Sequence, residues 1–173
     1  MSPKIIFQIH LVLGYVAWLL CFGTYIWPRL RTMDHVEAQR AIATLHSFRF
    51  FGLVFILPGV VGSNLPPQFA NFAATYDFVT GVLAILALLT VRIRPLFWLF
   101  VVAFNLVGVG DLILDYTHAV QIDLPARAGE LGAAYAIPII YVPTLMITHL
   151  IAFYLLVQRQ FNAGRALAGA AAS

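Results

Sequence analysis

The chain has 173 residues, of which 62% are hydrophobic and only 10% are charged. Soluble globular proteins carry about 25% charged residues, so this composition excludes a soluble domain and predicts an integral membrane protein. The formal net charge of +3 comes from basic residues dispersed between the apolar runs. It predicts contact with a lipid bilayer and argues against a nucleic-acid-binding surface. The single cysteine, Cys21, excludes an intrachain disulfide framework.

Apolar runs of about twenty residues recur along the chain, the length that a helix needs to cross ~30 Å of hydrocarbon. Short strands of alternating hydrophobicity are not evident. The expected fold class is therefore an all-α integral membrane protein, a bundle of five transmembrane helices in one domain. We expect these helices at about residues 5–27, 46–63, 69–91, 96–114 and 133–157, followed by a short mobile cytoplasmic tail at 158–173.

The first run, 5–27, is too long for the apolar core of a secretory signal peptide, so we expect it to be retained as a membrane helix. His10 lies on the same helical stripe as Gly14, Ala17 and Cys21. Small residues let membrane helices approach closely, so this stripe is expected to face the bundle and to carry His10 with it. A packing hydrogen bond and a ligand contact both stay open for this histidine.

Residues 28–45 are the long polar stretch of the chain and are expected outside the hydrocarbon, in part as a short interfacial helix. The second crossing, 46–63, begins with His46 and Arg49. An arginine near the end of a membrane helix can extend its head group to the interface, so Arg49 is expected to snorkel. Pro58 is expected to bend the other end of this crossing.

The third crossing carries a carboxylate inside its apolar run. Asp77 shares a helical face with Thr80, Gly81 and Ala84. An ionised side chain at the centre of a membrane helix costs about 2.5 kcal/mol or more, so it normally faces a protein partner or a cavity. The small neighbours predict that Asp77 points into the bundle, either toward a ligand or toward a structural partner.

The fourth crossing holds the densest group of polar residues, in the stretch NLVGVGDLILDYTH from Asn105 to His118. Asp111, Asp115 and His118 are spaced by four and three residues, which places them on one helical face. Two glycines precede Asp111 and allow either close packing or a local break in the helix. We expect the helix to end just before Asp115, which then lies at the membrane edge at the start of an acidic connection.

The fifth crossing contains Pro138, Pro143 and His149. Prolines leave backbone carbonyls without a donor, and inside a membrane these must be met by neighbouring helices, hydroxyls or water. A kinked fifth helix is therefore expected to form one wall of a cavity. His149 lies on the side where such a helix needs partners, so it is expected inside the bundle.

Basic residues predict the orientation. The first and third connections and the tail are rich in arginine, whereas the second has none and the fourth has more acidic than basic residues. Positive charges mark the cytoplasmic side, so we expect the N-terminus outside and the C-terminus in the cytoplasm. Helical rise then separates an outer acidic cluster from an inner basic one. The outer cluster contains His10, Asp77, Asp111, Asp115 and His118, and the inner one contains His46, Arg49 and His149, with Asn105 near the middle.

Two segments of the chain carry a resemblance. FNLVGVGDL at residues 104–112 and LGAAYAIPIIYVPTLMITHL at residues 131–150 resemble an uncharacterised family of small bacterial membrane proteins that share FN-G-DL and LGAAY-IP-VP-TH segments. The resemblance covers the last two crossings well and the rest loosely. It implies a location in the bacterial inner membrane and supplies no activity.

The residues therefore favour a protein that binds or translocates a proton, a cation or a small amphipathic ligand through an outward-facing polar cavity. We expect Asp77 and Asp111 to approach each other, or His10, in that cavity, because neither stays charged and unpaired in hydrocarbon. The candidate ligand-binding residues are His10, Asp77, Asn105, Asp111, Asp115 and His149.

Two other classes of function stay open. The first is a metal- or haem-dependent membrane enzyme, although the spacing of the histidines and carboxylates matches no metal motif, and the expected depths of His46 and His149 differ too much for a bis-histidine haem. The second is an accessory or assembly subunit, in which the buried polar residues only join helices. The sequence assigns no catalytic residue or cofactor, and it leaves open an oligomer or a partner subunit.

Overall fold

The computed structural model describes the backbone of residues 1–171 and the side chains of residues 1–158. Helices account for nearly all of the described chain, and no strand occurs in that part, which confirms the all-α class. The first rod runs through α1 (Pro3–Cys21), the π-helical turn η1 (Phe22–Ile26) and α2 (Trp27–Leu30). The later elements are α3 (His35–Ser47), η2 (Phe48–Ile56), α4 (Pro67–Leu89), α5 (Arg94–Gln121), η3 (Leu124–Tyr135), η4 (Ile137–Tyr141) and α6 (Val142–Ala171).

Four described helical segments are long and apolar enough to cross a membrane. They are Pro3–Leu30, Pro67–Leu89, Arg94–Gln121 and Ile137–Gln158. These segments correspond to the first, third, fourth and fifth crossings expected from the sequence, with the fourth extended by about two turns. Asp115 and His118 therefore lie within α5 rather than in a connection, and α6 continues as a helix beyond residue 158.

The second expected crossing differs from the sequence prediction. The rod begins at His35, where the Asp34 side chain caps α3 by accepting a hydrogen bond from the Val36 backbone N–H at 2.7 Å. It passes without interruption into the 3₁₀ helix η2 and ends at Ile56, so the last part of the predicted 46–63 helix is a loop. What was expected to be an interfacial helix and a separate crossing is one rod, which begins at residue 35 rather than 46 and ends at residue 56 rather than 63.

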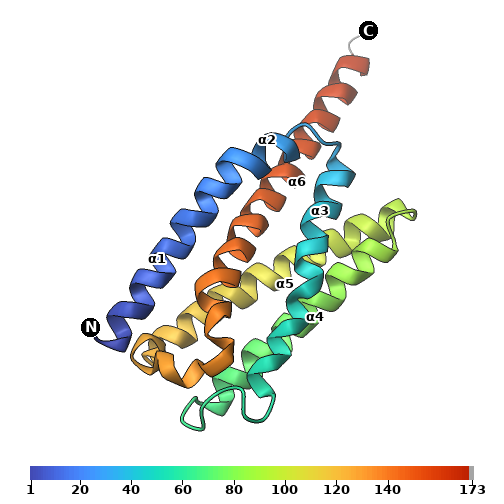
Figure 1. Ribbon diagram of the computed structural model, residues 1–173. Helices are drawn as coiled ribbons and strands as arrows, with labels where there is room; N and C mark the ends of the chain where they lie inside the picture. Colours follow the sequence, from blue (N-terminus) through green and yellow to red (C-terminus); the bar gives the residue numbers. More distant parts are fainter. Residues whose placement is uncertain (172–173) are drawn as a thin grey trace.

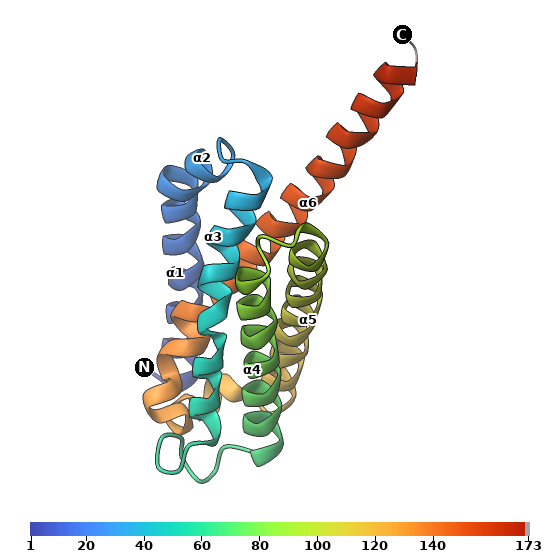
Figure 2. The ribbon, with the colours of Figure 1, turned by 90° about the vertical axis from the view of Figure 1, so that its right-hand side faces the viewer.

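The helices pack lengthwise. α4 and α5 form an antiparallel pair, α3 and η2 lie along α4, and α1 lies on the other side against η3, η4 and α6 (Figures 1 and 2). The described ends of the chain lie at opposite ends of the bundle. Two apolar clusters fill the interior. One, near the N-terminus, includes Phe7, Phe55 and Leu131, and the other includes Ile42 and Phe104.

The prolines of the fifth segment distort it as expected. Residues Ile137–Tyr141 form a π-helical turn at the start of the segment, and Pro143 lacks the N–H that an α-helix would offer to the Ile139 carbonyl. Gly14 of α1 packs there, because a Cβ at that position would lie 2.1 Å from the Ile139 oxygen. The Trp18 indole also donates to the neighbouring Ile140 oxygen at 2.8 Å. Gly14 of the small-residue stripe thus faces the kinked helix, but His10 and Ala17 of the same stripe are exposed, so the prediction that the whole stripe faces the bundle is wrong in part.

Candidate functional site

A buried arginine joins three elements between the two apolar clusters. Arg49 on η2 is fully buried. Its Nε donates to Asp77 Oδ1 on α4 at 2.6 Å, and its Nη2 donates to Asp111 Oδ2 on α5. Its Nη1 lies 3.3 Å from the Gly108 carbonyl oxygen, to which it donates. A planar guanidinium can serve several acceptors at once, so Arg49 holds η2, α4 and α5 together.

His149 on α6 completes this network, and its hydrogen bonds fix its tautomer. Its Nε2 lies 3.3 Å from Arg49 Nη1, which can only donate, so Nε2 accepts. Its Nδ1 therefore carries the proton and donates to Asn105 Oδ1 at 2.9 Å. The Asn105 amide nitrogen donates in turn to the Val101 carbonyl at 2.8 Å. His149 is neutral in this arrangement, as expected for a histidine beside a guanidinium.

A second histidine lies against the first. The His46 and His149 rings have centroids 4.0 Å apart. The Thr148 hydroxyl donates to backbone oxygens of its own helix, so His46 Nε2, 3.0 Å away, must be the donor to that hydroxyl. His46 Nδ1 is buried and has no hydrogen-bond partner among the described residues. The histidines therefore continue the polar network from Arg49 toward α3.

Glycines make the room that the network needs. A Cβ at Gly108 would lie 2.5 Å from His149 Nε2 and 2.7 Å from Arg49 Nη1. A Cβ at Gly52 would lie 2.2 Å from Asp77 Oδ2. By contrast, a Cβ at Gly110 would meet nothing within 4 Å. Of the two glycines before Asp111, Gly108 therefore serves close packing, and the helix does not break there.

Two sequence expectations about these residues are confirmed and two are wrong. Asp77 and Asp111 approach each other, since both bind the same guanidinium, and His149 lies inside the bundle. The separation of an outer acidic from an inner basic cluster is wrong, as is the snorkelling of Arg49. The error came from the second crossing. A rod that begins at His35 rather than His46 carries Arg49 to the level of the carboxylates.

The other predicted site residues lie outside this network. His10 is exposed, and its Nδ1 pairs with the Tyr135 hydroxyl at 2.9 Å, so it neither faces the interior nor approaches Asp77 or Asp111. His118 turns toward α4, where its ring meets Phe72 edge-on at a centroid distance of 4.7 Å. Asn105 and Asp111 are therefore the buried polar residues of α5, and His118, partly buried against α4, has an Nδ1 without a hydrogen-bond partner among the described residues.

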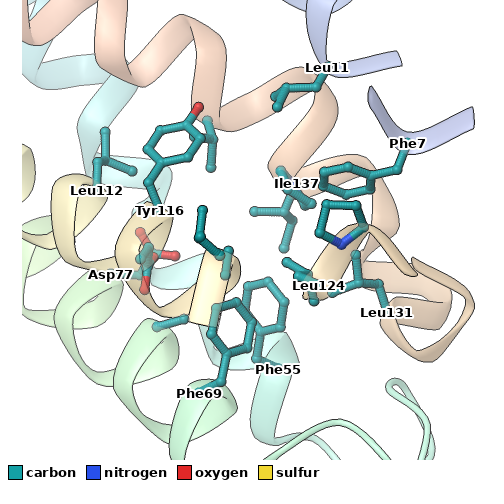
Figure 3. A pocket seen from close by; sticks show the side chains of 17 residues that line it. Phe7, Leu11, Phe55, Phe69, Asp77, Leu112, Tyr116, Leu124, Leu131 and Ile137 are labelled. Atoms are coloured by element: carbon teal, nitrogen blue, oxygen red, sulfur yellow. The ribbon is translucent and has the colours of Figure 1, made fainter. Parts of the chain in front are cut away.

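A cavity of about 140 Å³ lies next to the network, toward the end of the bundle where α1 begins. Figure 3 shows Asp77 and Tyr116 on one side of it, with apolar side chains around the rest. Asp115, one helical turn beyond Asp111, also lines it. Pro138 and Val142 form part of the wall, which confirms that the kinked fifth segment borders a cavity. The apolar lining residues come from α1, η2, α4, α5, η3, η4 and α6 and include Phe7, Leu11, Phe55, Phe69, Ala119, Leu124, Leu131 and Ile137.

η3, which contributes Leu124, Pro125 and Leu131 to the cavity wall, is joined to the loop after η2. The Gly62 backbone N–H donates to the Glu130 carbonyl at 2.7 Å. Gly132 has a φ of +51°, which favours glycine, and a Cβ there would lie 2.2 Å from the Val60 oxygen. Lys4 of α1 pairs with Asp123 at 3.1 Å at the same end. The η3 part of the cavity wall is thus held in place by its neighbours.

Within the described residues, no group of three or more histidine, cysteine, aspartate or glutamate side chains is arranged to hold a metal ion. His46 and His149 lie at the same level, contrary to the depths expected from the sequence. Their rings, however, are stacked at 4.0 Å, and His149 uses both of its nitrogens in hydrogen bonds. Bis-histidine haem ligation needs two ring nitrogens pointing at one iron, so this pair does not fit it.

The two segments that resemble the uncharacterised family, residues 104–112 and 131–150, lie at the centre of this site. The first contains Asn105, Gly108 and Asp111, and the second contains His149. A family model described as a domain of unknown function, DUF8737, matches residues 6–157. The chain belongs to this family. The match covers every residue of the network and of the cavity. No curated protein and no solved structure matches the chain. The family therefore confirms the resemblance to an uncharacterised group and supplies no activity.

Sequence reasoning missed Arg49 as a site residue. A comparison of acidic and basic residues inside the apolar runs could have found it. Asp77 and Asp111 each needed a cationic partner or a proton, and Arg49 was a basic residue inside an apolar run. Placing it at a helix end removed that candidate from consideration.

Proposed function

We propose that this chain is a five-helix protein of a bacterial inner membrane that binds a small, mainly apolar ligand in the cavity beside the Arg49 network. The observation that carries the proposal is the cavity itself. It has about the volume of engineered cavities that bind benzene, its lining is mainly apolar, and carboxylates lie on one side. A pocket of apolar walls with a few convergent polar groups is the usual form of a small-molecule site.

In addition to the four long apolar segments, the proposal counts the rod of α3 and η2 as a crossing, the second along the chain. The rod contains 13 α-helical and nine 3₁₀ residues. At 1.5 Å and ~2.0 Å per residue its length is on the order of 35 Å, enough for ~30 Å of hydrocarbon. With the arginine-rich connections in the cytoplasm, five crossings place the N-terminus and the cavity on the outer side. The cavity then opens to the outer half of the membrane.

The topology predicts a labelling pattern. In a Cys21→Ala background, a cysteine introduced at Ser63 should react with an impermeant maleimide in intact cells, whereas one at Thr32 should react only after the membrane is permeabilised. Both positions are exposed. If the α3 and η2 rod does not cross the membrane, the two cysteines must label on the same side. Labelling of Thr32→Cys in intact cells would contradict the orientation.

The cavity predicts binding of small aromatic probes. Benzyl alcohol should bind to the protein in nanodiscs, and Ala73→Phe should abolish the binding because Ala73 is a buried residue of the cavity wall. Ala119→Phe, which fills the cavity from α5, is a second blocking variant. The measurement is ¹⁹F NMR of a fluorinated probe. Because the blocked variants have no open cavity, the signal that remains with them measures partition of the probe into lipid. Equal signals from the wild type and both blocked variants would refute a binding cavity.

A further inference from the structure

Arg49 faces more negative charge than it can neutralise. Three carboxylates, Asp77, Asp111 and Asp115, lie within electrostatic reach of one another and of its guanidinium. Arg49 directs its hydrogen bonds to Asp77, Asp111, the Gly108 carbonyl and His149. None of these bonds reaches Asp115. The cluster with all groups ionised therefore carries excess negative charge in a site of low dielectric, where such an excess is costly.

The excess negative charge lies at Asp115, on the wall of the cavity. Its Oδ1 is buried and has no hydrogen-bond partner among the described residues. Asp77 and Asp111 are bound to Arg49, so Asp115 is the carboxylate on the cavity wall that lacks a cation. Buried polar atoms are nearly always satisfied, and each exception calls for a water, an ion, a proton or a ligand that meets it. A proton or a ligand cation can fill this role at Asp115.

We propose that the ligand of this cavity is a monovalent cationic amphiphile, a protonated amine with an apolar body about the size of one aromatic ring, and that its ammonium group replaces a proton on Asp115. This inference rests on the proposed function, since it names the ligand class of the same cavity. The apolar body lies among side chains such as Phe55, Phe69 and Leu131, where aromatic faces also favour a cation. The ammonium donates to Asp115.

Other ligand classes fit less well. An anion would meet the carboxylates of the wall. A divalent metal ion would need several free oxygen ligands, and Asp77 and Asp111 are bound to Arg49. A neutral apolar molecule would fill the volume and leave Asp115 Oδ1 without a partner. An amine supplies both the apolar contact and the missing charge.

Binding and protonation are linked in this arrangement. When the carboxylic acid of Asp115 loses its proton to solvent, the ammonium takes the proton's place, and the charge of the site is unchanged. Affinity for the cation should therefore rise with pH, until the amine itself loses its proton. The charged groups that act on Asp115 are Asp111 on its own helix, Asp77 on α4 and Arg49 on η2. His118 follows one turn later on α5 with a buried Nδ1 that has no partner among the described residues, and Tyr116, also in the cavity wall, pairs with Tyr15 of α1 at 2.6 Å.

The test compares two probes of nearly equal shape, benzylamine and benzyl alcohol, on the full chain in nanodiscs. Wild-type protein should bind benzylammonium at least about tenfold more tightly than the Asp115→Asn variant does. Benzyl alcohol should bind both proteins equally within about twofold. Glu37→Gln is the matched control, since Glu37 is exposed, pairs with Arg40 on the surface of α3 and does not line the cavity. It should leave both affinities unchanged.

A second measurement uses the wild type alone, so it does not depend on folding of the variant. Calorimetry in two buffers of different ionisation enthalpy should show release of up to one proton on binding of benzylammonium and none on binding of benzyl alcohol. Equal affinity for both probes with no proton release, or no effect of Asp115→Asn, would overturn the cationic ligand and leave the apolar cavity intact. Failure of both probes to bind would overturn the ligand class and the proposed function together.

Discussion

Replacing Arg49 with methionine should lower the free energy of unfolding by about 3–5 kcal/mol. Arg49 is fully buried, and its removal leaves Asp77 and Asp111 in the interior without a cation. Methionine has a similar length and keeps the packing of the aliphatic stem, so the loss reports mainly the unpaired charges. The measurement is an SDS-induced unfolding titration in mixed micelles, with the wild type as reference.

The matched control is Arg40→Met. Arg40 pairs with Glu37 on the surface of α3 at 2.6 Å, and both side chains are about half exposed. An exposed pair of this kind is worth about 1 kcal/mol or less, so the control should unfold almost as the wild type does. A loss at Arg49 no greater than the loss at Arg40 would mean that the buried network contributes little to stability.

A thermodynamic cycle separates charge from packing. In an Asp77→Asn/Asp111→Asn background, Arg49 is the unpaired charge, so Arg49→Met should there be neutral or stabilising rather than costly. The two aspartate substitutions should also be non-additive with each other, because both partners bind one guanidinium. Simple additivity of all three substitutions would show that these residues act independently, contrary to the observed contacts.

Adding a methyl group at Gly108 should destabilise the protein by about 1–3 kcal/mol. The new Cβ would lie 2.5 Å from His149 Nε2 and 2.7 Å from Arg49 Nη1, closer than atoms of these kinds can approach. Neither neighbour can move freely, since Arg49 is held by carboxylates on two helices and His149 by Asn105. We expect Gly108→Ala to separate α5 from α6 or to break the bond between Arg49 and His149.

Gly110→Ala provides the control on the same helix. A Cβ at Gly110 would meet nothing within 4 Å, so this substitution tests helix propensity without steric overlap and should leave stability unchanged or slightly higher. The ¹⁵N shifts of the His149 ring give an independent measurement. In the wild type they should report a neutral imidazole protonated at Nδ1, and in Gly108→Ala that pattern should change. Equal stability of the two alanine variants would contradict the close packing at Gly108.

The sequence by itself determined the class of the protein and the inward direction of several polar side chains. Composition and run length predicted helices able to cross a membrane, and four of the five expected segments occur close to their predicted positions. Asp77 and Asp111 were predicted to meet, and His149 to be buried, because a polar group in an apolar run normally faces the protein interior or a cavity rather than lipid. These inferences depend on local periodicity and on the cost of burying charge, both of which can be evaluated one helix at a time.

Only the tertiary structure decided where Arg49 lies. Hydropathy excluded α3 from the expected second crossing because it contains several polar residues, yet five of its residues are buried, including the polar Gln39 and His46. Gln39, for example, donates to the Ala152 carbonyl of α6 at 2.9 Å. A polar helix can enter the bundle when neighbours satisfy its donors, and the residues of one helix do not reveal what its neighbours offer. The register of this rod moved Arg49 from an expected helix end to the centre of the carboxylates, and so joined two clusters that the sequence kept apart.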